Sequence, residues 1–268
     1  MSSHGALNTG VNGVWAAAAR HGSASGWRQY AAPQRLYPLA GRCAPWCLAL
    51  ALVLTALGLY VGLWQAPTDH QQGEAYRILF VHVPTAWLSM VMYLALAGWA
   101  AAGWVLNTRL SFMMARALAP TGTLMTLLAL WTGALWGRPT WGTWWVWDAR
   151  LTSELILLFL YIGFMALQAA IDDPRRADRA GALLALVGVV NVPVIYFSVR
   201  WWNTLHQGAS ISFSAAPTLD NAMLLGLLLC TAGLWAYAAG AVLLRLRCII
   251  LEREAGAHWL TRLPELRS

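Results

Sequence analysis

The sequence contains no lysine, and charged residues of all types make up only 11% of its 268 positions. A soluble domain carries about 25% charged residues, whereas 59% of this chain is hydrophobic. The motif GxxxxGK[ST], which cradles nucleotide phosphates in P-loop proteins, is also absent. These absences argue against a soluble enzyme and against a P-loop ATPase, and they indicate an integral membrane protein.

Cysteine is scarce as well, and its positions argue against a disulfide framework outside the membrane. The four cysteines fall within apolar stretches or on the side that carries most of the arginines: Cys43, Cys47, Cys230 and Cys248. We therefore interpret them as small apolar packing residues.

The chain does contain six continuous apolar stretches, at about 46–64, 85–106, 117–136, 151–171, 181–199 and 222–244. Each is close to the roughly 20 residues that a helix needs to cross about 30 Å of hydrocarbon. The runs do not alternate as membrane-spanning strands would. We predict an all-α polytopic membrane protein, a six-transmembrane-helix bundle over residues 31–250. Pro193 predicts a local irregularity in the fifth helix.

The arginines predict the orientation of this bundle. All but four of the 18 arginines lie in segments on one predicted side of the membrane. These segments precede the first apolar stretch, connect the second to the third, connect the fourth to the fifth, and follow the sixth. The positive-inside rule then makes both termini cytoplasmic, with outer loops at about 65–84, 137–150 and 200–221. Since this placement explains the net charge of +7, we expect membrane lipid rather than nucleic acid as a partner.

The two ends of the chain are predicted to lie outside the bundle. Residues 1–30 are rich in alanine, glycine and serine and lack the apolar core of a signal peptide. We expect a disordered cytoplasmic extension there, and a cytoplasmic tail over residues 251–268.

The most distinctive stretch is the tryptophan loop, residues 141–150, with the sequence WGTWWVWDAR. An aromatic belt at the membrane interface would explain the isolated tryptophans elsewhere. Anchoring does not require this density, which Trp201 and Trp202 in the third outer loop increase. Because indole offers a large stacking surface, the pattern predicts a platform for a flat apolar ligand, formed by Trp141, Trp144, Trp145, Trp147, Trp201 and Trp202.

Two histidines, His82 and His206, lie at the outer ends of neighbouring apolar segments. A single histidine at a membrane boundary is commonly a hydrogen-bonded structural residue. A converging pair could instead supply axial nitrogens to a haem iron or part of a zinc site. Zinc usually takes four ligands, and only His70 is available as a weak third candidate. Two histidine nitrogens beside a platform of tryptophans therefore suit haem better than zinc.

The outer cations and carboxylates complete the candidate site. Arg77 and Arg150 flank the histidines and the tryptophans, where a guanidinium could pair with the propionates of such a ligand. We interpret Arg138 and Arg200 as contacts for lipid phosphates. Asp148 is placed to cap the fourth helix and so to orient the tryptophan loop, and Glu154 is expected in the first turn of that helix, near its positive end.

The segment WGTWWVWDARLTSE at residues 141–154 resembles the tryptophan-rich "WWD" motif of the haem-handling superfamily. Together with LFVHVP at 79–84 and WWNTLHQG at 201–208, it is similar to the CcmC family, the haem-presenting component of bacterial cytochrome c maturation. The resemblance covers about residues 30–250, and the first ~25 residues look like an extension beyond the usual family start.

The resemblance implies that haem b is held at the periplasmic face of the bacterial inner membrane by the tryptophan loop, with His82 and His206 as iron ligands. It also implies delivery to the haem chaperone CcmE, in a complex with the ABC transporter subunits CcmA and CcmB and the small subunit CcmD. Assistance to covalent attachment of haem to the chaperone, as by a lyase, stays open.

Two other interpretations compete with haem delivery. The chain could move haem across the bilayer, although charges deep within the spans, which usually mark such a path, are nearly absent. It could also be a structural subunit whose tryptophans serve only as packing anchors.

Overall fold

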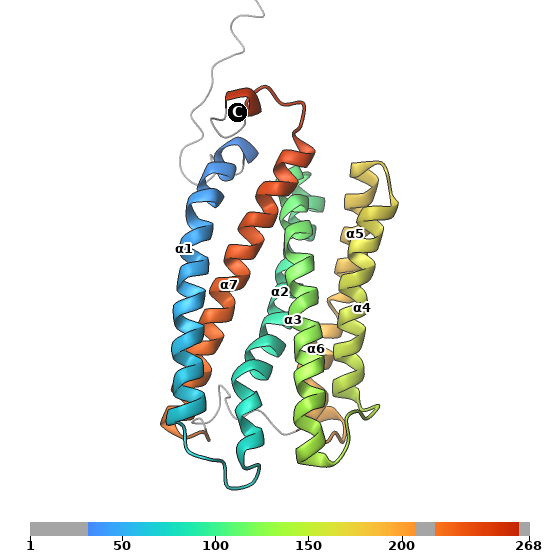
Figure 1. The fold of residues 1–268 in the computed structure, drawn as a ribbon. Helices are drawn as coiled ribbons and strands as arrows, with labels where there is room; N and C mark the ends of the chain where they lie inside the picture. Colours follow the sequence, from blue (N-terminus) through green and yellow to red (C-terminus); the bar gives the residue numbers. More distant parts are fainter. Residues whose placement is uncertain (1–31, 207–217, 263–268) are drawn as a thin grey trace, which may run out of the picture.

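The computed structural model describes residues 32–206 and 218–262, and every named element in these ranges is helical. Six segments of this part are long and apolar enough to cross a membrane: Pro33–Gln65, Glu74–Leu106, Arg109–Trp141, Ala149–Ala170, Pro174–Trp201 and Asn221–Arg253. They confirm the predicted all-α polytopic fold (Figure 1). The expected extension at 1–30, part of the third outer loop (207–217) and the end of the tail (263–268) lie outside the described residues.

The bundle is built from helices whose bounds are α1 Pro33–Tyr60, α2 Leu79–Leu106, α3 Arg109–Trp141, α4 Ala149–Ala170, α5 Pro174–Gly188, α6 Asn191–Trp201 and α7 Asn221–Arg253. Helix α1 packs along α7, and α2 packs along α3 at the centre (Figure 1). Helix α4 lies against α3 on one side and against α5 and α6 on the other. The described chain begins and ends at the same end of the bundle, as an even number of spans requires.

Ion pairs join helices at the end of the bundle that the arginines predict to be cytoplasmic. They connect α7 and the residue that follows it with α5 and α3: Arg253–Asp178 at 2.9 Å, Arg116–Glu252 at 3.1 Å and Arg109–Glu254 at 3.3 Å. The grouping of these connections at one end agrees with the predicted topology. The side of the membrane that this end faces stays a prediction.

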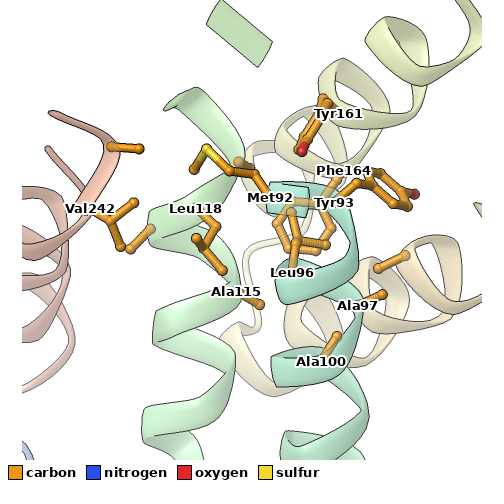
Figure 2. Packing of buried hydrophobic residues seen from close by; sticks show 14 of the residues in the cluster. Met92, Tyr93, Leu96, Ala97, Ala100, Ala115, Leu118, Tyr161, Phe164 and Val242 are labelled. Carbon is orange, nitrogen blue, oxygen red and sulfur yellow. The ribbon is translucent and has the colours of Figure 1, made fainter. Parts of the chain in front are cut away.

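A buried hydrophobic core fills the middle of the bundle between α2, α3, α4 and α7 (Figure 2). At its centre the rings of Tyr93 and Tyr161 pack edge to face with centroids 5.0 Å apart. The Tyr161 hydroxyl donates a hydrogen bond to the carbonyl of Ser89 at 2.8 Å, which joins α4 to α2. Small buried residues such as Ala97 and Ala115 let the helices approach closely.

The fifth span is interrupted, as Pro193 predicts. Helix α5 ends at Gly188 and α6 begins at Asn191, two residues before the proline. The carbonyl of Val189, which loses its usual helical donor to Pro193, accepts instead from the N–H of Val192 at 3.1 Å. The Asn191 side chain donates to the Ser153 carbonyl at 2.8 Å and so ties the break to α4.

The first outer loop ends earlier than expected. A 3₁₀ turn, η3 (Glu74–Ile78), leads directly into α2 at Leu79, whereas the loop was predicted to extend to residue 84. Leu79 and Phe80 are buried in a small cluster with Met223 and Leu227 of α7, and this burial draws them into the helix. As a consequence His82 is held in the first turn of a packed helix rather than in a loop.

Candidate functional site

A cavity of about 830 Å³, counting the volume open at its mouth, lies at the end of the bundle where α3 ends and α4 begins. It is enclosed by α2, α3, α4, the tryptophan loop and the residues after α6. Because its lining comes from positions between 72 and 206, only the folded chain assembles it.

The structure brings six of the predicted site residues together around this cavity: His82, Trp141, Trp144, Trp145, Arg150 and His206. They come from the ends of three helices, α2, α3 and α4, and from two non-helical segments, the tryptophan loop and the residues after α6. The remaining predicted residues are placed outside its lining: Arg77, Trp147, Asp148, Trp201 and Trp202.

The rings of the two histidines lie close together in the wall of the cavity. Their ring centroids are 6.2 Å apart, and the ring planes are inclined by 36°. His82 is 9% exposed, whereas His206 is partly exposed in the non-helical stretch after α6. The ring of Trp136 packs edge-on against His82 at 5.6 Å, and the ring of Trp141 lies 6.3 Å from that of His206. The convergence that the sequence only suggested is therefore present.

Helix α3 holds the ring of His82 in place. Its Nδ1 atom is 3.1 Å from the hydroxyl oxygen of Thr132. Gly133 follows directly, and a Cβ added there would lie 3.0 Å from the Cε1 atom of His82. A side chain at this position would press on the imidazole, so the glycine lets the ring lie close to the helix.

The tryptophan loop has a defined turn at each end. Gly142 ends α3 with a φ of +79°, a left-handed conformation that glycine adopts without strain. The Thr143 hydroxyl donates to the Trp145 carbonyl at 2.9 Å. Asp148 accepts from the N–H of Leu151 at 2.8 Å and caps α4, which confirms the sequence prediction.

Several tryptophans of the predicted platform face outward. Trp147 is 76% exposed, and Trp144, Trp201 and Trp202 each expose about half of their surface. Of these four only Trp144 also lines the cavity. Trp145 lines the cavity, and its buried indole N–H has no hydrogen-bond partner within the described residues.

The two charged residues of the cavity, Arg150 and Glu154, also join helices. Arg150 donates to the Ile195 carbonyl of α6 at 2.8 Å. Glu154 is 6% exposed and accepts from the Ser89 hydroxyl of α2 at 2.8 Å. Since α4 begins at Ala149, Glu154 falls in its second turn, not the first turn that the sequence suggested.

Arg77 holds the first outer loop to the end of α1 and is not part of the cavity wall. Its guanidinium donates to the Gly62 carbonyl at 2.7 Å and pairs with Glu74. The carbonyl of Gly62 belongs to the π-helical turn η2 (Val61–Gln65), which continues α1. The predicted contact of Arg77 with a ligand carboxylate stays a prediction.

Sequence reasoning missed three residues of the site: Gln72, Thr132 and Gly133. Trp136, five residues before the tryptophan loop, donates its indole N–H to Gln72 at 2.7 Å and so fastens the first outer loop to α3. A signal was present, because small residues recur every four positions on one face of α3, at Ala129, Gly133 and Gly137. Such a stripe leaves room beside a helix.

The zinc alternative finds no support in this part of the chain. Among residues 32–206 and 218–262, no three His, Cys, Asp or Glu side chains gather closely enough to hold a metal ion. The cavity offers two imidazoles, aromatic walls, one guanidinium and one carboxylate, that of Glu154.

Comparison with known proteins agrees with this chemistry. A family model described as "CcmC: Heme exporter protein C" matches residues 26–261. Heme exporter protein C of Escherichia coli K12 is 45% identical over 235 residues, covering 88% of this chain and 95% of that protein. The Bradyrhizobium diazoefficiens protein of the same name is 50% identical over 196 residues, covering 73% and 74%. A putative cytochrome c biosynthesis ccmC-like mitochondrial protein of Marchantia polymorpha is 42% identical over 199 residues, covering 74% and 84%.

Proposed function

Because this chain belongs to the CcmC family, the family of heme exporter protein C, we propose that it binds haem in the outer cavity and presents it for transfer. A haem-handling role in cytochrome c maturation and a multi-pass membrane location follow from the family and from the six spans. The finer proposal concerns the residues that hold haem and the side on which they do so.

The observation that carries the proposal is the spacing of the two imidazoles. Two iron–nitrogen bonds of about 2 Å each, plus about 1 Å from each nitrogen to its ring centre, place two axial imidazoles roughly 6 Å apart. The centroids of His82 and His206 are 6.2 Å apart. Both side chains face the same cavity, so the pair has the separation that one haem iron requires.

The remaining walls suit the rest of a haem molecule. Trp141, Trp144 and Trp145 provide flat apolar surfaces for the porphyrin ring. Arg150 provides a guanidinium for a propionate. The indole N–H of Trp145, which has no hydrogen-bond partner in the part of the chain that the structure describes, provides a donor. When bound, haem supplies the iron that the histidines ligate, while these side chains orient its ring and its carboxylates.

A presenting protein must leave part of its cargo accessible. The cavity opens at the end of the bundle, and the exposed indoles of Trp147, Trp201 and Trp202 lie on segments that border it. We propose that this end faces the periplasm of a bacterial inner membrane and that haem b passes from it to CcmE. Orientation of haem beside the acceptor would supply much of the rate, and CcmA, CcmB and CcmD are the proposed partners.

Transport of haem through this chain alone is the second candidate. The core beneath the cavity argues against it, because the rings of Tyr93 and Tyr161 pack together between α2 and α4 (Figure 2). The Tyr161 hydroxyl also donates to the buried Ser89 carbonyl. A path through the bundle would have to separate this core.

Titration of the purified full-length protein with haemin in detergent tests the proposal. We expect a Soret band with the spectrum of six-coordinate, bis-histidine iron, and its loss in the double variant His82→Ala/His206→Ala. His70→Ala is the matched control, because His70 lies exposed in the first outer loop. An unchanged spectrum in the double variant would exclude the proposed ligands, and haem accumulation in sealed vesicles containing only this chain would favour transport.

A further inference from the structure

We propose that Thr132 is a positioning residue, which fixes His82 as the tautomer with its proton on Nδ1 and presents a bare Nε2 to the haem iron. This inference rests on the proposed function and extends it to a side chain that contacts the proposed iron ligand rather than the iron. Thr132 lies on α3, 50 residues away from His82 in the sequence, and its contact with His82 is buried.

The direction of the hydrogen bond follows from the other contacts of the threonine. A hydroxyl has one proton to donate, and the Thr132 hydroxyl donates it to the backbone of its own helix. The acceptor is the Leu128 carbonyl at 2.6 Å, with the Ala129 carbonyl farther away at 3.3 Å. The hydroxyl oxygen is therefore left as an acceptor toward the imidazole.

The protonation of His82 then follows. With its acceptor 3.1 Å away, Nδ1 is the atom that carries the proton. A neutral imidazole has one N–H and one bare nitrogen, so Nε2 retains the lone pair that a metal ligand needs. Histidines that bind metals usually donate their other N–H in this way, which fixes both the tautomer and the ring orientation.

The packing of the ring supports the same assignment. A Cβ placed on Gly133 would be 3.0 Å from Cε1, 3.5 Å from Nδ1 and 4.0 Å from Nε2. The Nδ1–Cε1 edge thus lies against α3, and of these three atoms Nε2 is the farthest from it. The edge-on contact with Trp136 restrains the ring from another side.

The tautomer can be measured without haem. In full-length protein labelled with ¹⁵N-histidine and reconstituted in lipid vesicles, the His82 signals are identified by their loss in His82→Gln. We expect solid-state NMR to show a protonated Nδ1 and a bare Nε2 in the wild type and in Thr132→Ser, and loss of this preference in Thr132→Val. A proton on Nε2 in the wild type, or an unchanged tautomer in Thr132→Val, would overturn the proposal.

Haem binding provides the second readout. Loss of an outer-shell partner typically weakens metal binding by about 10–100-fold, and we expect a loss of that order for haemin in Thr132→Val, with recovery in Thr132→Ser. The iron reduction potential should rise in Thr132→Val, because a histidine without its Nδ1–H bond is a poorer electron donor. Equal affinity and potential in Thr132→Val and the wild type would count against the positioning role.

Thr126→Val is the matched control. Thr126 is a fully buried threonine of the same helix that donates to its own backbone, at the Gly122 carbonyl, and it does not line the cavity. We expect it to bind haemin like the wild type. Failure of the proposed function would look different, because the wild type itself would then bind no haemin while the tautomer of His82 remained measurable.

Discussion

The two candidate iron ligands are held in very different ways. His82 lies in the first turn of α2, buried and bonded to Thr132 of the neighbouring helix. His206 lies in a non-helical stretch after α6, is partly exposed, and packs near the ring of Trp141. One imidazole is thus built into the bundle, and the other is supplied by a loop.

This difference is informative for a protein that must bind haem and then release it. A ligand fixed by a packed helix is preorganised and costs little entropy to use. A ligand on a loop can be moved away with few other contacts broken. We infer that His82 defines where the iron sits and that His206 is the ligand whose loss accompanies transfer.

The largest expected effect comes from removing each histidine separately. His82→Ala removes a proposed iron ligand itself, so it should weaken haemin binding by more than the roughly 10–100-fold loss that follows removal of a side chain behind such a ligand. His206→Ala should cost less and should recover when imidazole is added, because this side of the site is partly exposed. Haemin titration followed at the Soret band measures both. Equal losses and equal rescue in the two variants would remove the contrast between them.

The next effect tests the close contact between α3 and His82. Gly133→Ala places a methyl group 3.0 Å from Cε1 of His82, so the ring must shift and haemin binding should weaken by about tenfold, as for other outer-shell changes. Gly98→Ala is the control, since a Cβ added there meets nothing within 4 Å. If both alanine variants bind haemin equally well, the position of His82 does not depend on α3.

A smaller effect concerns the cap that ends the tryptophan loop. Asp148→Ala removes the hydrogen bond to the Leu151 N–H and should lower the stability of the protein by about 1 kcal/mol. Asp173→Ala removes the equivalent cap of α5, which accepts from the Arg176 N–H at 2.7 Å. Thermal unfolding should show similar losses for both, whereas haemin titration should weaken only for Asp148→Ala. A loss of haemin binding in both variants would make it a general effect of stability.

The smallest expected effect distinguishes the two outer arginines. Arg77 pairs with Glu74, whose side chain is largely exposed, and such pairs contribute about 0–1 kcal/mol. Since Arg77 also lies outside the cavity wall, Arg77→Gln should change haemin affinity by less than about fivefold, the equivalent of about 1 kcal/mol. Arg150→Gln should weaken it more, because Arg150 lines the cavity. The opposite order in a haemin titration would support the predicted propionate contact of Arg77.

Much of the fold could be predicted from composition. The six spans follow from continuous apolar runs near the length of a bilayer, and the break in the fifth span follows from the missing N–H of Pro193. The cap at Asp148 was predictable because side-chain capping is local. The start of α2 was not, because Leu79 and Phe80 become helical through burial against residues of α7 that lie more than 140 positions later.

In the candidate site, too, some features could be predicted from the sequence and others depend on how the helices pack. By itself the sequence determined that tryptophans, two histidines and arginines cluster in the segments that connect the apolar spans at one end of the bundle, because the spans depend on hydrophobicity along the chain. Only the tertiary structure decided which of them share a cavity, and it placed Arg77, Trp147, Trp201 and Trp202 outside the cavity wall. It also brought Thr132 against His82, since contacts between helices depend on packing, which no local pattern encodes.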